Sequence, residues 1–185
     1  MANIMKRLET ERLVLRTIEE SDAADFYEYS KSPIVGPDAG WKPHESIEES
    51  KKVIQMFRNE MEVWAIELKE TGKIIGSVGI HKSSKGDLKY DRELGYALSD
   101  KYWGRGIMTE AAKKVIEYAF CEATGINTIC VSHFTFNHRS ERVIDKCGFK
   151  YIKTIKECWK RFDGKCLDED CYLLTKEMYL AEKNK

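Results

Sequence analysis

Two glycines, Gly104 and Gly106, lie where a run typical of a strand meets a run typical of a helix. The strand-like run is Leu94–Leu98, and the helical run begins near Ile107. Free backbone N–H groups at a helix start, together with the helix dipole, favour the binding of an anion such as phosphate. Glycines let the backbone approach that anion closely because they lack a Cβ atom. An ordinary tight strand-to-helix turn has the same pattern, so both interpretations stay open at this point.

A second segment, Asn137–Phe149, favours the anion site. It matches the pattern Asn-x-x-Ser-x-x-Val-x-x-Lys-x-Gly-Phe, and Tyr102–Ala111 matches Tyr-Trp-Gly-x-Gly-x-x-Thr-Glu-Ala. In these two runs the chain resembles the GNAT family of acetyl-CoA-dependent N-acetyltransferases. The resemblance is strongest to the branch that contains the ribosomal-protein N-terminal acetyltransferases. Glu11–Arg16 and Asp170–Glu177 add further matches near the two ends, so the ordered set covers nearly the whole chain.

Length and charge narrow the class of protein. The 185 residues fit one domain, which we expect to span 1–185. Lysine plus arginine number 31, equal to aspartate plus glutamate, and a formal charge of zero argues against a nucleic-acid partner. No run is long and apolar enough to cross a bilayer, and the first residues lack the apolar segment of a signal peptide. We therefore expect a cytoplasmic protein with neither a nucleic-acid nor a membrane partner.

The six cysteines do not indicate a metal site. None forms a Cys-x-x-Cys pair, and none stands at zinc-ligand spacing with a histidine, so we expect no metal. A disulfide framework is not expected in a cytosolic chain of this size. Cys121, Cys130 and Cys147 lie within apolar patterns and are predicted to be small buried hydrophobic residues.

Hydrophobic periodicity predicts first paired strands and later alternating strands and helices. Strands are predicted at 13–17, 64–68, 74–80, 93–98, 128–133, 151–157 and 171–175. This order predicts an α/β (α+β) fold, a mixed sheet with helices on its faces. The GNAT resemblance implies the same layout, mostly antiparallel, with the central strands 93–98 and 128–133 splayed apart and the cofactor in the wedge between them.

Four helices are predicted from capping residues and apolar spacing. They are a short one from Asp22 with Ser21 as its cap, one after the Ser46–Glu49 capping box, one from Gly106 to Gly125, and one at 140–146. The second is expected to bury Ile47, Ile54, Phe57 and Met61, and the third Ala112, Val115, Ile116, Ala119 and Phe120. The stretch 31–44 holds all three prolines and is predicted to be a loop, and the charged segment 81–92 a surface connection.

The resemblance implies how acetyl-CoA binds. Its pyrophosphate lies against the backbone from Gly104 to Thr109, and its pantetheine arm lies along residues 96–98 as another strand would. Asn137 contacts the far end of that arm, although a helix cap or turn residue is the alternative role. The predicted cosubstrate-binding residues are Tyr96, Ala97, Leu98, Trp103, Gly104, Arg105, Gly106, Ile107, Met108, Thr109, Asn137 and Ser140.

The sequence departs from the family pattern in three places. Met108 stands where the phosphate-loop signature ends in Gly or Ala, and its bulk is expected to tighten the loop. Ile144 replaces the tyrosine acid of many relatives, and Ile152-Lys153 replaces the Glu-Gly of this branch. Ser140 is then the best candidate to protonate or hydrogen-bond the leaving sulfur, with a helix N-cap as its alternative role.

Acetyl transfer to an amine also needs a base, because only the neutral amine attacks and a lysine side chain titrates at about 10.4 and an α-amine at about 8. Glu93 is the candidate on the central strand, acting through a water, and an ion pair with a nearby Lys or Arg is its alternative role. His133 and His138 are weaker candidates, since a lone histidine at a strand end is usually structural. Trp41 is expected to line the acceptor pocket or, alternatively, only to anchor its loop.

These observations predict an enzyme, an acetyl-CoA-dependent N-acetyltransferase. It would move the acetyl group to a primary amine, on a protein N-terminus or a small molecule, by direct attack on the thioester, and a homodimer is left open. The alternative is a non-catalytic acyl-CoA-binding module of the same fold, which the missing tyrosine and Glu-Gly favour. A nucleotide-phosphate enzyme is disfavoured, because the chain lacks Gly-x-x-x-x-Gly-Lys-[Ser/Thr].

Overall fold

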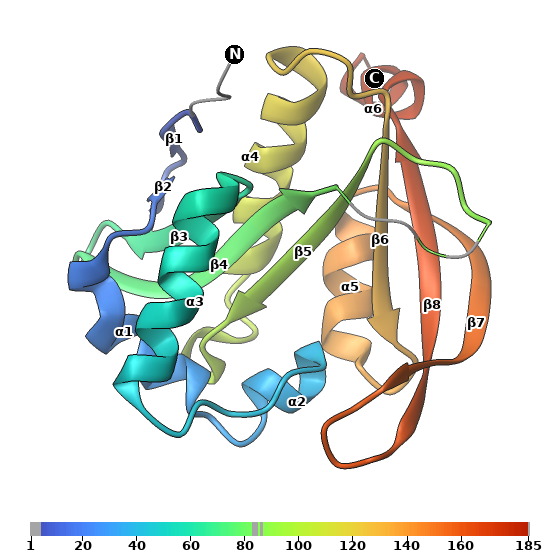
Figure 1. Ribbon diagram of the computed structural model, residues 1–185. Coiled ribbons are helices and arrows are strands. Elements are labelled where there is room, and N and C mark those ends of the chain that lie inside the picture. The colour runs from blue at the N-terminus through green and yellow to red at the C-terminus, as the bar shows by residue number, and fades with distance from the viewer. Residues whose placement is uncertain (1–4, 83–84, 86, 185) are drawn as a thin grey trace.

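One eight-stranded sheet runs through the molecule in the order β1-β2-β3-β4-β5-β6-β8-β7 (Figure 1). The computed structural model describes residues 5–82, 85 and 87–184; residues 1–4, 83, 84, 86 and 185, which include parts of the N-terminal and 81–92 segments considered above, lie outside the described residues. The strands are β1 (Leu8–Glu9), β2 (Leu13–Thr17), β3 (Val63–Leu68), β4 (Lys73–His81), β5 (Arg92–Leu98), β6 (Thr128–Phe134), β7 (Lys150–Lys160) and β8 (Cys166–Thr175). The helices are α1 (Ala23–Ser30), α2 (Val35–Ala39), α3 (Ile47–Glu60), α4 (Ile107–Cys121), α5 (His138–Lys146) and α6 (Lys176–Lys183), with short 3-10 turns at Glu20–Asp22 and Asp100–Tyr102.

The two central strands part soon after they meet. β5 and β6 run parallel and pair only at Arg92 with Ile129 and at Glu93 with Cys130. All other neighbouring strands are antiparallel, and β4 and β8 follow β5 and β6 as these two diverge (Figure 1). The predicted mixed, mostly antiparallel sheet with splayed central strands is confirmed.

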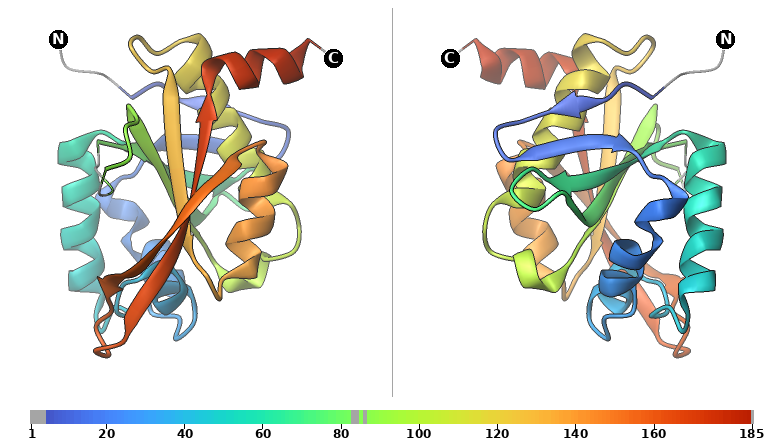
Figure 2. Two further views of the ribbon diagram at one scale, coloured as in Figure 1. Left: turned by 90° about the vertical axis from the view of Figure 1, so that its right-hand side faces the viewer. Right: turned by 90° about the vertical axis from the view of Figure 1, so that its left-hand side faces the viewer.

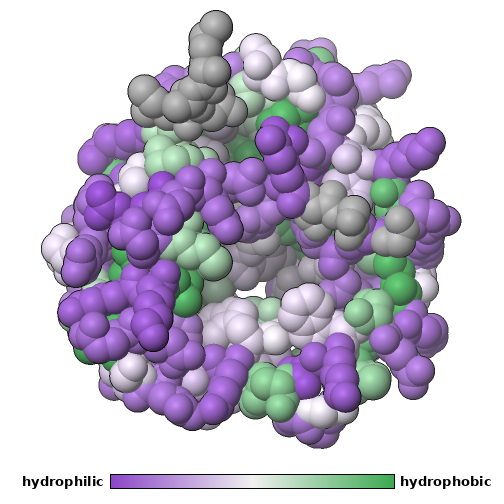
Figure 3. Space-filling model, in the orientation of Figure 1, coloured by the Kyte–Doolittle hydropathy of each residue, from purple (hydrophilic) through white to green (hydrophobic). Residues whose placement is uncertain are grey.

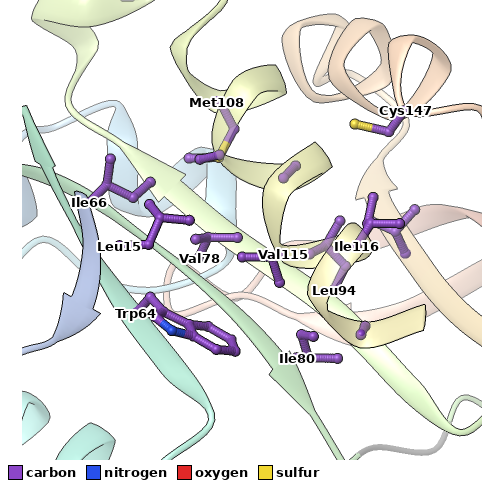
Figure 4. Close-up of a cluster of buried hydrophobic side chains, with 14 of the residues drawn as sticks. Leu15, Trp64, Ile66, Val78, Ile80, Leu94, Met108, Val115, Ile116 and Cys147 are labelled. Carbon is purple, nitrogen blue, oxygen red and sulfur yellow. The ribbon is translucent and has the colours of Figure 1, made fainter. Parts of the chain in front are cut away.

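Helices cover both faces of the sheet. Figure 2 shows α4 and α5 on one face and α1 and α3 on the other. The main core lies under α4, where Val115 and Ile116 face Val78 and Leu94 of the sheet (Figure 4). A second, smaller cluster joins α1 and α3 to the opposite face. All five predicted core residues of α4 are buried, because apolar side chains three and four residues apart share one helix face.

The helix predictions need four corrections. α4 ends at Cys121 rather than Gly125. The prediction that Cys121 is buried is wrong, because this residue lies off the buried face of α4 and is exposed; Cys130 and Cys147 are buried as predicted. The cap near Asp22 is not Ser21: Glu19 and Asp22 form a reciprocal capping box there. In α3, Ile54 is buried and Ser46 caps the helix, but Phe57 and Met61 are half-buried and Ile47 is exposed. The predicted loop 31–44 contains α2.

The sequence predicts the two ends of the chain less completely than its centre. The last hairpin is longer than predicted, with β7 reaching Lys160 and β8 starting at Cys166 on either side of a turn at Asp163-Gly164. β1 and α6 were not predicted, because a two-residue strand and a mostly charged terminal helix give weak periodicity. In residues 5–82, 85 and 87–184, every helix falls short of the length and apolarity that a membrane crossing requires.

The core under α4 is expected to supply much of the stability. Phe120 is fully buried there, so Phe120→Ala is expected to lower the free energy of unfolding by about 3–5 kcal/mol through lost apolar contact and a cavity. Ile152 on β7 is 44 % exposed, and Ile152→Ala is expected to change the free energy of unfolding by about 0.5 kcal/mol at most. Urea unfolding of both variants measures the difference, and equal losses would contradict this assignment of the core.

Candidate active site

A cleft of about 780 Å³ opens where β5 and β6 diverge. In the space-filling view the molecule is hollowed near the centre of this face (Figure 3). Its walls come from β5, β6, β7, α2, α5 and the start of α4. The predicted cosubstrate residues that line it are Tyr96, Ala97, Leu98, Trp103, Gly104, Gly106, Ile107, Met108, Thr109, Asn137 and Ser140. Arg105 is not among the lining residues; its guanidinium lies 5.3 Å from the centre of the Tyr102 ring.

The glycines at the start of α4 are required by their backbone conformation. Gly104 and Gly106 have φ of 75° and 73°, in the left-handed region that favours glycine. A Cβ would meet nothing within 4 Å at Gly104, and only Arg12 Nη2 at 3.8 Å at Gly106. The first helical bond of α4 runs from the Glu110 N–H to the Gly106 carbonyl at 3.0 Å, so the preceding N–H groups are free of helical partners. The loop thus combines open space with donors suited to a phosphate.

Glu110 fastens this loop to the N-terminal hairpin. It accepts hydrogen bonds from Arg12 Nε at 2.7 Å, from the Arg12 N–H at 3.1 Å and from Thr10 Oγ1 at 2.5 Å. Arg12 also donates to the Arg105 carbonyl at 3.0 Å. Burial acts to raise the pKa of Glu110, but the hydrogen bonds from Thr10 and Arg12 outweigh it and hold that pKa below its usual value. The carboxylate therefore stays charged and keeps the loop in place.

Tyr96 and Ser140 form a pair of hydroxyl groups on the α5 side of the cleft. Their oxygens are 2.7 Å apart. Burial raises the pKa of Tyr96 above its usual value, so its hydroxyl stays protonated and able to donate. The N-cap role for Ser140 is wrong: the cap of α5 is Asn137, whose Oδ1 accepts from the Ser140 N–H at 3.2 Å. The alternative cap role of Asn137 is thus observed, although Asn137 also lines the cleft.

Contacts between α2, α5 and the β5–α4 connection close the mouth of the cleft. Asn137 Nδ2 donates to the Asp38 carbonyl at 3.0 Å, and Arg139 forms an ion pair with the Asp38 carboxylate. The Arg139 guanidinium lies 4.0 Å from the centre of the Trp103 ring, and Trp103 Nε1 donates to the Leu98 carbonyl at 2.9 Å. These contacts therefore connect α5, on the β6 side of the cleft, with α2 and the end of β5 where the two strands lie farthest apart.

Glu93 lies at the point of divergence, in a triad with Lys85 and Glu169. Lys85 Nζ is 3.2 Å from Glu93 Oε1 and 2.6 Å from Glu169 Oε2, and all three residues line the cleft. Their side chains are 15 % (Lys85), 18 % (Glu93) and 11 % (Glu169) exposed. Burial alone would lower the pKa of Lys85, but the charge of Glu93 and the hydrogen bond to Glu169 raise it above its usual range. The alternative role of Glu93 in an ion pair is thus observed within the cleft itself.

Sequence reasoning missed Lys85, Glu169 and the hydroxyl of Tyr96. Glu169 reaches the cleft because β8 places it opposite Phe134 of β6, a pairing that a single sequence does not reveal. Lys85 stands in the segment predicted to be a surface connection. Strand alternation puts Tyr96 on the face of β5 opposite Glu93, and this pattern could have predicted that the Tyr96 hydroxyl lies toward α5.

The remaining candidates divide between cleft and surroundings. His133 lines the cleft but is buried, with Nδ1 2.8 Å from the Phe134 carbonyl and Nε2 3.2 Å from the Tyr172 hydroxyl. His138 is exposed, pairs with Glu141 and does not line the cleft.

Trp41 and Met108 face the interior. Trp41 lies outside the lining and packs on the smaller core cluster, its ring centre 5.4 Å from that of His44. Met108 lines the cleft, but it is only 5 % exposed and belongs to the main core (Figure 4). Among the described residues, no group of three or more His, Cys, Asp or Glu side chains is placed to hold a metal ion.

Comparison with known proteins agrees with this geometry. The family description "Acetyltransferase (GNAT) domain" matches residues 12–150. The uncharacterized N-acetyltransferase YoaA of Bacillus subtilis is 31 % identical over 175 residues, which cover 91 % of this chain and 96 % of that protein.

Two crystal structures have the same fold at low sequence identity. A GNAT-family acetyltransferase from Bacillus anthracis superimposes with a TM-score of 0.82 at 22 % identity, covering 93 % of this chain and 99 % of that one. The ribosomal-protein-S5-alanine acetyltransferase of Vibrio fischeri gives 0.74 at 22 % identity, covering 93 % and 97 %. The family match, the relative and the shared fold together place this chain in the GNAT family, as an N-acetyltransferase.

Proposed function

We propose that the protein binds acetyl-CoA between β5 and β6 and transfers its acetyl group to a primary amine by direct attack on the thioester. The observation that carries this proposal is the divergence of the two strands after Glu93 and Cys130. In the described part of the chain, no strand pairs with that edge of β5 beyond Glu93. The amides of a pantetheine arm can bond there as an added strand would, with the pyrophosphate at the start of α4.

The two sides of β5 supply different parts of the chemistry. Glu93 and Tyr96 point to opposite faces of the strand because successive side chains alternate. Glu93 takes the proton of the attacking amine, directly or through a water, while the amine nitrogen bonds to the acetyl carbon. Backbone N–H groups stabilise the oxyanion that forms. The carbon–sulfur bond then breaks, and the Ser140 hydroxyl, hydrogen-bonded to Tyr96, donates a proton to the leaving thiolate. Solvent water returns a proton to Ser140 and takes the one held by Glu93, which restores the enzyme.

Ile144 replaces the tyrosine acid of many relatives, and the Tyr96–Ser140 pair supplies hydroxyl groups in the cleft instead. Tyr96 lies on β5 rather than on α5, but its hydroxyl is hydrogen-bonded to the hydroxyl of Ser140 on α5. Glu93 likewise supplies a carboxylate in the cleft although Ile152-Lys153 replaces Glu-Gly. Both observations support a catalytic protein over a non-catalytic acyl-CoA-binding module.

Ligand binding and turnover test the proposal together. A ligand that binds only the folded protein raises its melting temperature, so acetyl-CoA and CoA are expected to raise it and ATP to raise it much less. A panel of peptide and small-molecule amines, followed by thiol release, measures acetylation. An ATP effect equal to that of acetyl-CoA would overturn the assignment. Strong acetyl-CoA binding without acetylation of any amine would indicate the binding module instead.

Gly106→Val is expected to weaken acetyl-CoA binding by at least about tenfold. A branched side chain at this position enters the space in front of the phosphate loop and strains a left-handed backbone. Gly125→Val is the matched control, because Gly125 has a φ of 75°, close to the 73° of Gly106, and open surroundings but lies outside the cleft. Calorimetric titration of both variants measures the effect. Equal affinities for acetyl-CoA would exclude this role for the loop.

Removal of either hydroxyl is expected to lower kcat more than acetyl-CoA affinity. Ser140→Ala loses the proposed donor to the thiolate, and Tyr96→Phe loses its partner, so each is expected to lower kcat by about 10²-fold. Because Asn137 provides the cap, Ser140→Ala is expected to leave the melting temperature nearly unchanged. Because the pKa of Tyr96 is raised, its hydroxyl is expected to stay protonated up to about pH 10, and the wild-type rate is expected to show no fall from its deprotonation in that range. Wild-type kcat in both variants would remove the pair from the mechanism.

Glu93→Gln tests the base. If Glu93 accepts the proton, kcat/KM is expected to fall by about 10²-fold or more across the alkaline range. The wild-type profile is expected to rise toward the pKa of the acceptor amine, because only the neutral amine attacks. The measurement is kcat/KM against pH for both proteins with one amine. A variant with the wild-type profile would show that water alone removes the proton.

A further inference from the structure

The α2 side of the cleft combines charged groups at its base with an apolar wall. The base is the triad Lys85, Glu93 and Glu169 described above. The wall includes Phe134, Ile155 and Trp159, which line the same cleft. This side lies across β5 from the Tyr96–Ser140 pair, and the proposed function leaves it for the acceptor.

The triad carries an uncompensated negative charge. Two carboxylates share one ammonium, and among the described residues no other basic side chain pairs with Glu93 or Glu169. The net charge of the triad is therefore −1 in a cleft where its side chains are largely screened from water. Charges interact more strongly in such surroundings than in bulk water, so an entering cation is attracted and an anion is repelled.

The site already holds a primary alkylammonium. Lys85 Nζ bonds to both carboxylates, which shows that their oxygens accept from the donor group that a protonated amine carries. The negative field extends to Cys130 on β6. The pKa of its thiol is raised to about 12, first by burial and then by the charge of Glu93.

The wall beside the triad suits an apolar body. The centre of the Phe134 ring is 5.7 Å from that of Phe136, stacked on it, and 6.5 Å from that of Trp159. Trp159 Nε1 donates to the Gly40 carbonyl at 3.2 Å, which fixes this wall against the end of α2. Rings in this position can contact both the apolar part of a ligand and its cationic end.

We propose that Glu93 and Glu169, with Lys85 between them, bind the ammonium group of the acceptor, which is a cationic primary amine with an apolar body. The inference rests on the proposed function: the bound ammonium loses one proton to solvent and attacks as the neutral amine, and Glu93 takes the second proton as the carbon–nitrogen bond forms. Glu169 is the specificity-determining residue of the pair: it adds the second negative charge and has no part in the proton transfer. An amine with a carboxylate beside the nitrogen is rejected by the same charge.

Binding of three probes that share a phenylethyl body to the CoA-saturated protein tests the charge preference without turnover. The probes are 2-phenylethylamine, 2-phenylethanol and 3-phenylpropanoate, which present an ammonium, a neutral hydroxyl and a carboxylate on similar bodies. Calorimetry is expected to give at least about tenfold tighter binding for the ammonium than for either other probe. Equal or tighter binding of the alcohol or the carboxylate would overturn the inference.

Charge-changing variants test the assignment to the triad. Glu169→Gln makes its net charge zero and is expected to weaken 2-phenylethylamine binding by about tenfold with CoA binding unchanged. The double variant Lys85→Met/Glu169→Gln restores −1 and is expected to recover affinity to within about threefold. Lys156→Met is the control, because Lys156 pairs with Asp168 outside the cleft lining and its loss is expected to change nothing.

The outcomes separate the two proposals. Full affinity in Glu169→Gln, or no recovery in the double variant, would overturn the ammonium site. Acetylation of the amine panel is measured separately, with acetyl-CoA. A protein that shows the expected binding pattern but acetylates no amine would contradict the proposed function while the ammonium site stands.

Discussion

The site depends on how little of β5 and β6 is paired. Two residue pairs hold the strands together, at Arg92 with Ile129 and at Glu93 with Cys130. Every other feature of the cleft follows from the divergence beyond that point. β4 satisfies one edge of β5 and β8 one edge of β6, so each strand stays rigid while its other edge faces the gap. The sheet thus offers backbone groups to a ligand without giving up its own stability, which the core under α4 supports from one face.

β5 also separates two chemical environments. The side of Tyr96 faces α5 and carries neutral hydroxyl groups, whereas the side of Glu93 carries a triad with a net negative charge. This separation suits a reaction in which one partner leaves as a thiolate and the other arrives as an ammonium. A thiolate next to the triad would be repelled. The charged residues of α5 that line the cleft in the described part of the chain are basic, Arg139, Arg142 and Lys146, so an ammonium on that side would meet like charges. The alternation of side chains along one strand is sufficient to keep them apart.

Local patterns predicted the parts of the fold that are local. Near neighbours in the chain determine the apolar spacing of α4, the capping serine of α3 and the glycines before α4. The splayed sheet was expected from the family resemblance that the ordered motifs carry. The failures concern tertiary contacts. Glu169 enters the cleft only because β8 pairs with β6, and Lys85 only because both carboxylates are there to receive it. The sequence left open whether Trp41 faces the cleft or the core, and in the structure it packs on the smaller core cluster. Gly36 leaves room for the Trp41 ring, because a Cβ at that position would lie 2.6 Å from it.

The contacts of α2 have a consequence for how such a cleft can diversify. This five-residue helix is linked to α5 through Asp38 and to β7 through the Gly40 carbonyl, opposite the end where the central strands are joined. The separation of the two halves at the open end is therefore set by side chains and a short connection, with no sheet hydrogen bond involved. Substitutions in α2 can widen or reshape the entrance while the ladder of the sheet stays intact. Acceptor preference can in this way change during evolution at little expense in folding stability.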